Sequence, residues 1–227
     1  TDSVVRNNLL YNNHASGISL YQIDGGSGSH DNRVLNNTIV MASDGRWGIN
    51  IPGTVNTNNK LFNNIIYNDH SWRGSITIGS PTLSGFESDY NVVMDRFSTD
   101  EGDTRLTLAQ WQALGYDQQS IIATPNQLFV NASAADYHLT PGSPAIDQIP
   151  VGANGCGTTI TTDQRGKPTP VKKDTYTVRG KAYTFNIRYQ ELKLQKHIED
   201  LFHPEKAKRG AIVYMHPEIK DKCPHFY

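Results

Sequence analysis

Two arginines stand at equivalent places in two copies of one short pattern. Arg46 lies just before the alternating segment 48–51, and Arg73 lies just before the similar segment 75–78. If these segments are neighbouring strands, the two guanidinium groups are stacked about 4.8 Å apart and repel each other unless an anion lies between or beside them. A guanidinium pairs with a carboxylate through two hydrogen bonds, and a carboxylated sugar is one such anion. The pair therefore indicates a site for an acidic ligand.

Side chains that could move protons or contact sugar rings surround the two arginines. The catalytic candidates are Asp44, Arg46, His70 and Arg73, and the substrate-binding candidates are His14, Asp24, His30, Trp47, Asp69 and Trp72. A histidine is the better proton carrier, because an arginine keeps its proton at ordinary pH. Asp24 and His30 belong to a long insertion, residues 22–32, of the kind that forms groove walls in repeat proteins. The alternative is that both arginines form surface salt bridges with Asp44 and Asp69 while the tryptophans pack against loops.

The elements that would hold these residues are visible as a repeat. An Asn-Asn pair with apolar neighbours occurs at residues 7–8, 36–37 and 63–64, and a degraded copy occupies residues 89–93. Counted from the second Asn, the steps are 29, 27 and 27 residues. Self-similarity at this period predicts a solenoid in which each repeat forms one layer. Asn suits the corners of such layers, because it tolerates left-handed backbone angles and its amide can bond its counterpart in the next layer.

A second part of each repeat predicts strands. The segments 17–20, 48–51 and 75–78 alternate apolar and polar residues, which is typical of a short strand with one buried face. Each layer therefore holds at least two short strands, which favours a parallel β-helix of three to four coils over a helical solenoid. We expect its core to contain Ile18, Leu20, Ile39, Ile49, Ile51, Ile65, Ile76 and Ile78.

Length and charge narrow the interpretation further. The chain has 227 residues and a net charge of −1, which argues against a protein held on nucleic acid by bulk charge. No apolar run approaches the ~18 residues of a membrane span. Cys156 and Cys223 could form one disulfide, but two cysteines so far apart in the sequence do not indicate whether the protein is in an oxidising or a reducing compartment. The chain begins nearly inside a coil, so we expect upstream coils or a partner to cover the strand edges at its amino-terminal end.

Residues 96–170 differ from the coils at 1–95 and contain a series of motifs. A predicted short helix around Trp111, with Thr107 as its N-cap, is followed by LFVN (128–131), DYHL (136–139), GSPAID (142–147) and D.RG (163–166). In this order the motifs resemble the carboxyl end of secreted bacterial right-handed parallel β-helix proteins, the pectate-lyase-like superfamily. The resemblance covers residues 1 to about 168. It implies an all-β, right-handed parallel β-helix that is closed by residues 96–170 and is secreted or on the bacterial cell surface.

The resemblance also implies a carbohydrate-active protein whose partner is an acidic polysaccharide. A polysaccharide lyase, which we favour, would neutralise a uronate with Arg46 and Arg73 and use His70 or His14 as the proton carrier. Such lyases often bind Ca²⁺ through carboxylates. Asp24, Asp31 and Asp44 are available here without a clear ligand motif, so Ca²⁺ stays open and no metal site is assigned.

Two alternatives to the lyase stay open. A glycoside hydrolase would place two carboxylates beside the scissile bond, Asp44 with either Asp69 or Asp24. A noncatalytic carbohydrate-binding or surface-attachment solenoid, or a fragment whose catalytic coils lie upstream of Thr1, would need no complete catalytic set. A flat aromatic strip formed by Trp47 and Trp72 would favour binding alone.

Residues 171–227 depart from the rest of the chain. They hold twelve Lys and Arg against seven Asp and Glu. A hairpin is predicted around residues 179–181, an amphipathic helix at 190–202 and a strand at 211–215. We expect a separable basic tail of α+β structure, because charge, Asn content and pattern all change near residues 168–170. Its basic residues are spread along the segment, which favours a solvated face, and its histidines and Cys223 do not show a recognised metal-ligand spacing.

Overall fold

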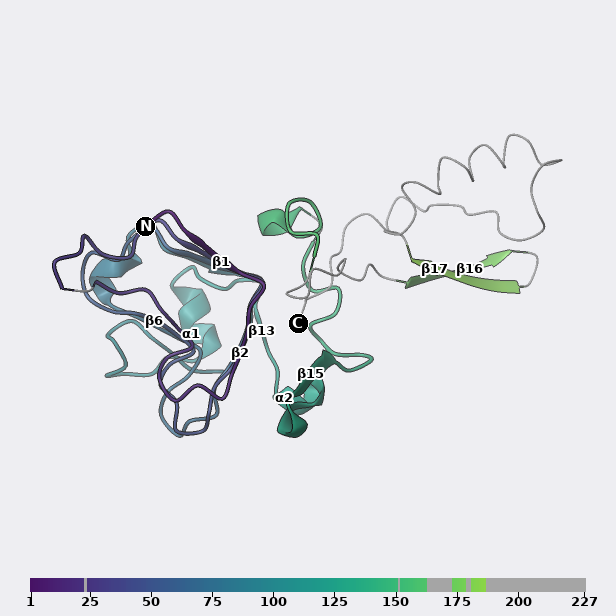
Figure 1. Cartoon of the computed structure of the whole chain (residues 1–227), viewed down its shortest axis with the longest axis horizontal. Helices are drawn as coiled ribbons and strands as arrows, with labels where there is room; N and C mark the ends of the chain where they lie inside the picture. Colours follow the sequence, from purple (N-terminus) through teal and green to yellow (C-terminus); the bar gives the residue numbers. More distant parts are fainter. Residues whose placement is uncertain (23, 151, 163–172, 179–180, 187–227) are drawn as a thin grey trace.

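Three parallel sheets stack the chain into a β-solenoid of about four turns (Figure 1). The computed structural model describes residues 1–22, 24–150, 152–162, 173–178 and 181–186, the last two ranges by backbone alone. The first sheet contains β1 (Val4–Arg6), β4 (Arg33–Leu35), β7 (Lys60–Phe62) and β10 (Glu87–Asp89). The second contains β2 (Leu9–Tyr11), β5 (Thr38–Val40), β8 (Ile65–Tyr67), β11 (Val92–Val93) and β13 (Ile121–Ile122). The third contains β3 (Ile18–Ser19), β6 (Ile49–Ile51), β9 (Ile76–Ile78) and β12 (Phe97–Ser98).

The register between coils follows the sequence repeat. Ile49 pairs with Ile76, and Ile39 pairs with Ile66, so equivalent residues of successive repeats stack directly. All eight residues predicted for the core are buried. Seven of them belong to the central apolar cluster inside the solenoid, whereas Ile65 faces outward from the second sheet and packs beneath the closing segment. The parallel β-helix predicted from the repeat is therefore confirmed.

A buried ladder of amides joins the four coils at one corner. The side-chain amide of Asn8 donates to Asn37 (2.9 Å), Asn37 donates to Asn64 (3.0 Å), and Asn64 donates to Asn91 (3.0 Å). The ladder ends on Asp117, whose Oδ1 accepts from the amide of Asn91 at 2.8 Å. The last three asparagines are almost completely buried, so each amide satisfies its neighbour where water cannot.

The first Asn of each pair turns the corner with its backbone. Asn7, Asn36 and Asn63 have φ values of 58°, 55° and 64°, and Tyr90 takes the same place in the fourth coil with a φ of 55°. Asn is the residue other than Gly that adopts this left-handed conformation most readily. The two Asn of a pair therefore have separate roles, one in the turn and one in the amide ladder.

The closing segment first packs α1 (Leu108–Ala113) against the central apolar cluster and then, from α2 (Pro125–Leu128) to β15 (Asp136–Leu139), covers the outer face of the second sheet. It also contains β14 (Phe129–Asn131), η2 (Ala132–Ala134) and η3 (Ala153–Gly155), and η1 (Ser80–Leu83) lies earlier in the chain. Leu128, Phe129, Tyr137 and Leu139 pack on Ile65 and its neighbours. Thr107 caps α1 as predicted: its side chain accepts from the backbone N–H of Gln110, and its own backbone N–H donates to Oε1 of Gln110. As Figure 1 shows, α2 and β15 lie on the side of the coils where β2 and β13 are, whereas α1 lies among the coils.

Part of the tail is also described. β16 (Lys173–Val178) and β17 (Lys181–Asn186) form an antiparallel pair, which confirms the predicted hairpin. The predicted helix at 190–202 and strand at 211–215, like Cys223 and the tail histidines, lie outside the described residues. Whether the tail is a separable unit stays a prediction.

Gly48→Ala should lower the free energy of unfolding by about 3 kcal/mol, because the coils leave no room for a methyl group there. An added Cβ would lie 2.4 Å from Cγ2 of Ile66 and 2.9 Å from the carbonyl oxygen of Ser75. Chemical denaturation of the full chain measures the change. Gly25→Ala is the control: its Cβ would meet nothing within 4 Å at a φ of +74°, and it should cost about 1 kcal/mol through backbone strain alone. Equal costs for the two variants would contradict close packing at Gly48.

Candidate functional site

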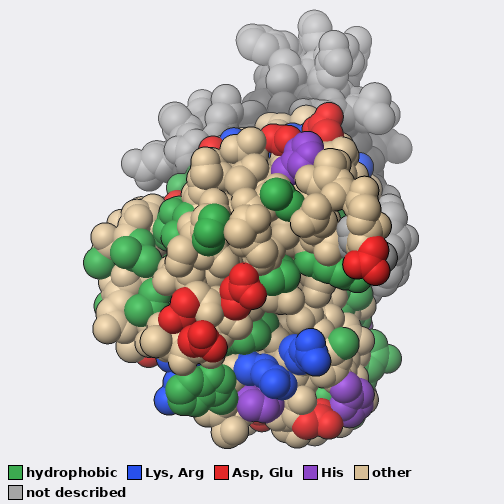
Figure 2. All heavy atoms as spheres, turned by 90° about the vertical axis from the view of Figure 1, so that its left-hand side faces the viewer, with side chains coloured by type: hydrophobic (Ala, Val, Ile, Leu, Met, Phe, Trp, Pro, Cys, Tyr) green, Lys and Arg blue, Asp and Glu red, His purple; other side chains and the backbone are tan. Residues whose placement is uncertain are grey.

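The predicted catalytic residues lie on the loops that join the second sheet to the third. Residues 12–17, 41–48 and 68–75 form these loops in three successive coils. We call their polar side chains, with one later arginine, the turn cluster: His14, Asp44, Arg46, His70, Trp72, Arg73 and Arg105. Figure 2 shows Lys, Arg and His side chains gathered at the lower edge of one face of the molecule, with Asp and Glu side chains beside them.

His14 and Asp44 form a pair within the turn cluster. Nδ1 of His14 lies 2.7 Å from Oδ1 of Asp44, and the side chains are 67% and 71% exposed. Because a carboxylate can only accept, Nδ1 carries the proton in this contact. Nε2 of the neutral ring therefore keeps a lone pair that faces away from Asp44. An exposed imidazole oriented by a carboxylate in this way is suited to accept a proton from a ligand.

Arg73 reaches back over the preceding coil toward this pair. Its guanidinium donates to the carbonyl oxygen of Gly45 at 3.4 Å, and Gly45 directly follows Asp44. Arg46 is exposed, its backbone N–H donates to the carbonyl of Ala15, and its guanidinium has no ion pair among the described residues. Arg46 therefore shares a loop with Asp44, and Arg73 lies on the loop of the next coil and reaches back toward Asp44.

His70 has a different part in the arrangement. Its Nδ1 accepts from the backbone N–H groups of Trp72 (2.9 Å) and Arg73 (3.1 Å), and the backbone N–H of His70 donates to Oδ1 of Asn68 at 3.0 Å. Since Nδ1 accepts, the proton of the neutral ring is on Nε2. His70 in this tautomer holds the loop that presents Arg73 and has no free lone pair with which to act as a base.

The two predicted tryptophans lie in different environments. Trp47 is buried, and a methyl group added to Gly102 would lie 2.9 Å from its Nε1. Trp72 is 44% exposed, and its Nε1 donates to the carbonyl oxygen of Gly102 at 2.9 Å. The guanidinium of Arg105 lies 4.3 Å from the centre of the Trp72 ring, a cation–π contact. The tryptophans therefore do not form one flat aromatic strip, and only Trp72 reaches the surface.

The remaining predicted residues do not join the His14–Asp44 pair. His30 lies in the loop between the third and first sheets and pairs with Asp31, with 2.5 Å between Nδ1 and Oδ2. The hydrogen bond from His30 lowers the pKa of Asp31. Asp24 is exposed in the same loop, and Asp69 is exposed beside Tyr67. No three His, Cys, Asp or Glu side chains gather around a point that would suit a metal ion in the part of the chain that the structure describes.

Arg96 and Arg105 were missed by the sequence analysis. Arg96 donates to the carbonyl oxygen of His70, and Arg105 donates to the carbonyl oxygen of Ser71 at 3.3 Å, so both support the loop before Arg73. They come from the fourth coil and the loop after it, where the Asn-Asn repeat has degraded. The sequence signal for Arg96 is that, like Arg73, it comes just before a strand of the third sheet, whereas Arg105 precedes α1 and has no such signal.

The described helices include none that is long and apolar enough to cross a membrane. Comparison of the chain with protein-family models, with curated protein sequences and with solved structures found no match.

Proposed function

We propose that the turn cluster binds a uronate-containing polysaccharide and cleaves it by β-elimination, in a secreted or cell-surface bacterial protein of the pectate-lyase-like kind. The observation that carries the proposal is the exposed His14–Asp44 pair, which leaves Nε2 of His14 as a proton acceptor on the same set of loops as Arg46 and Arg73. Cation, base and orienting carboxylate are the groups that elimination beside a carboxylate needs.

The chemical step assigns one role to each group. Arg73 and Arg46 pair with the uronate carboxylate and stabilise the charge that develops when the neighbouring carbon loses its proton. Nε2 of His14 takes that proton, and Asp44 stabilises the resulting imidazolium. The bond from the next carbon to the glycosidic oxygen breaks, its electron pair leaves with that oxygen, and the carbon–carbon bond becomes double. The leaving oxygen takes a proton from water.

Trp72 would extend the site beyond the reacting sugar. Its exposed ring could contact the apolar face of a neighbouring unit, and Arg105, stacked on that ring, adds a third cation along the line of Arg46 and Arg73. A polymer with one carboxylate per sugar would meet several of these cations together. His70 acts here as a positioning residue, because its Nδ1 holds the backbone of Trp72 and Arg73.

The test incubates the full chain with a panel of uronate polymers, with and without Ca²⁺, and follows the ultraviolet absorbance of the unsaturated product. We expect absorbance to appear and affinity to fall about 10- to 100-fold in Arg73→Ala, the usual range for a lost charge-assisted hydrogen bond. New reducing ends without absorbance would indicate hydrolysis in place of elimination. Binding of the polymer without any cleavage would indicate a noncatalytic binding protein. If Arg46→Ala and Arg73→Ala alter neither binding nor turnover of any acidic glycan, the turn cluster is not the site.

A further inference from the structure

A polar hollow lies on the outer face of the first sheet, away from the loops of the turn cluster. It encloses about 630 Å³, and its lining consists of Asp2, Asp31, Arg33, Leu35, Asn58, Lys60, Phe62, Gly85, Glu87 and Asn154. None of the ten residues that the sequence analysis selected for the site lies in it. A hollow of this volume is in the range of small-molecule sites and has room for one or two sugar units.

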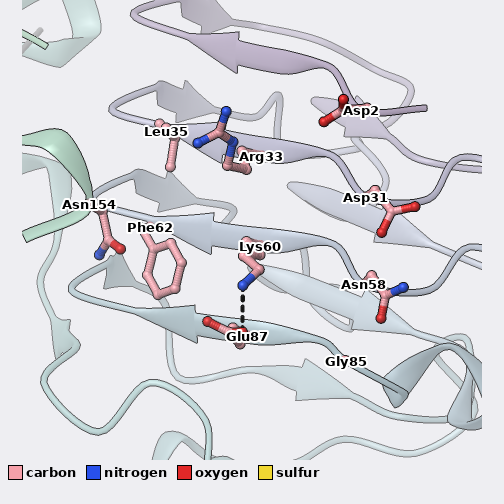
Figure 3. Close-up of a pocket in the computed structure, with 10 residues that line it drawn as sticks. All are labelled: Asp2, Asp31, Arg33, Leu35, Asn58, Lys60, Phe62, Gly85, Glu87 and Asn154. Atoms are coloured by element: carbon pink, nitrogen blue, oxygen red, sulfur yellow. Dashed lines mark hydrogen bonds and ion pairs between the residues drawn. The ribbon is translucent and has the colours of Figure 1, made fainter. Parts of the chain in front are cut away.

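Three charged side chains in register form its floor. Arg33 pairs with Lys60 across β4 and β7, and Lys60 pairs with Glu87 across β7 and β10, so the three lie in one row across the strands. Nζ of Lys60 is neutralised by Oε1 of Glu87 at 2.6 Å. Arg33 is exposed and makes no ion pair or side-chain hydrogen bond with the described residues. Figure 3 shows the guanidinium of Arg33 free while Lys60 is bonded to Glu87.

The two sides of the hollow differ in chemistry. One side carries the partly exposed ring of Phe62, the side chain of Leu35 and the amide of Asn154 (Figure 3). The other side carries Asp2, Asp31 and Asn58, each with a positive φ, at equivalent corners of three successive coils. An apolar face opposite a row of carboxylates and amides suits a ring that has C–H groups on one side and hydroxyl groups at its edge.

From this arrangement we propose that the first sheet carries a separate site for a carboxylated sugar unit, with the carboxylate held by Arg33, the ring packed on Phe62, and the hydroxyl groups bonded by Asp31 and Asn58. The unpaired guanidinium supplies the bidentate partner for the carboxylate. The proposal does not depend on the elimination proposed for the turn cluster.

The charges of the hollow select a ligand with one negative charge. Asp2, Asp31 and Glu87 place three carboxylates around the two cations Arg33 and Lys60. A doubly charged phosphate would meet this repulsion with twice the charge, whereas a neutral sugar would leave Arg33 unpaired. A sugar with a single carboxylate satisfies Arg33 and presents only hydroxyl groups to the acidic side.

The test titrates the full chain calorimetrically with glucuronate and galacturonate, and with glucose, glucose 6-phosphate and acetate as comparison ligands. We expect the uronates to bind at least 10-fold more tightly than the other three. Arg33→Gln should weaken uronate binding about 10- to 100-fold. Glu87→Gln should strengthen it severalfold, because Lys60 loses its partner and the hollow loses one negative charge. Asp103→Asn, at an exposed aspartate in the loop before α1 and outside both sites, is the control and should leave the affinity unchanged.

Opposite effects of two conservative substitutions within one row cannot come from a general loss of folding. Equal affinity for glucose and glucuronate, or an unchanged affinity in Arg33→Gln, would overturn the proposal. Loss of uronate binding in Arg105→Gln with retention in Arg33→Gln would move the binding to the turn cluster. If the full chain binds the single sugar but does not cleave any uronate polymer, the proposed elimination is wrong and the first-sheet site is unaffected.

Discussion

Asp117→Ala should lower the free energy of unfolding by about 3–5 kcal/mol, because three buried donors lose their acceptor together. Asp117 is fully buried, and it accepts from Asn91 (2.8 Å), Ser120 (2.5 Å) and Nε1 of Trp111 (2.7 Å). It therefore ends the amide ladder and ties it to α1. Chemical denaturation of the full chain measures the change. The control is Asp103→Ala, an exposed aspartate in the loop before α1, which should change the free energy of unfolding by less than about 0.5 kcal/mol.

The same carboxyl group should make stability depend on pH. Burial raises the pKa of Asp117 above its ordinary value, although the hydrogen bonds from Asn91, Ser120, Ser88 and Trp111 oppose the shift. The folded state then binds the proton more tightly than the unfolded chain. The stability that the protonated Asp117 carboxyl group adds is fully present below about pH 4 and is lost as the pH rises through its raised pKa. Unfolding of Asp117→Asn should lack this component, and identical pH profiles for the two proteins would contradict the shift.

His14→Ala should slow elimination about 10²- to 10⁴-fold, the usual contribution of a general base, while polymer affinity changes less than about 3-fold. Affinity should persist because it rests on Arg46, Arg73 and Trp72, which the substitution leaves in place. Initial rates by ultraviolet absorbance and equilibrium binding measured on the same polymer separate the two effects. A matched fall in rate and affinity would show that His14 only binds.

The chain offers a close control for this substitution. His138 is another exposed histidine bonded to an aspartate, with 2.6 Å between its Nδ1 and Oδ1 of Asp136. It lies on β15, in the closing segment rather than in the turn cluster. His138→Ala should leave the elimination rate unchanged. Equal losses in the two variants would indicate a general effect on folding rather than a base at His14.

The coils could be predicted in detail because the sequence repeat indicates both the length of a coil and the register between neighbouring strands. The second Asn of each pair needs its counterpart one coil away, and alternating segments such as 48–51 have only one register that buries both isoleucines. Which face of the second sheet Ile65 occupies could not be predicted. It lies next to Ile66 in the sequence, and only the closing segment, packed on the outer face of the second sheet, makes both positions apolar.

The site was less predictable, because its chemistry depends on which atom of a side chain is already engaged. His14 and His70 are equivalent proton carriers in the sequence, yet one uses Nδ1 to donate to Asp44 and the other uses it to accept from two backbone N–H groups. Burial of Trp47 by the loop around Gly102 could not be foreseen, since that loop follows the repeat. Arg33, Lys60 and Glu87 did carry a signal, a spacing of 27 residues between charged positions.

The amide ladder makes each coil an interchangeable unit of the chain. Asn37 meets Asn8 on one side and Asn64 on the other, so a coil presents the same chemistry to both neighbours. The first coil has a longer loop before β4 than the second has before β7, and the solenoid absorbs this difference outside its sheets. A duplication or excision of one whole coil would join Asn to Asn and Ile to Ile again, whereas a shift of one residue would turn every strand inside out. Duplication or deletion of whole coils in the gene can therefore lengthen or shorten the solenoid while the contacts between neighbouring coils stay the same.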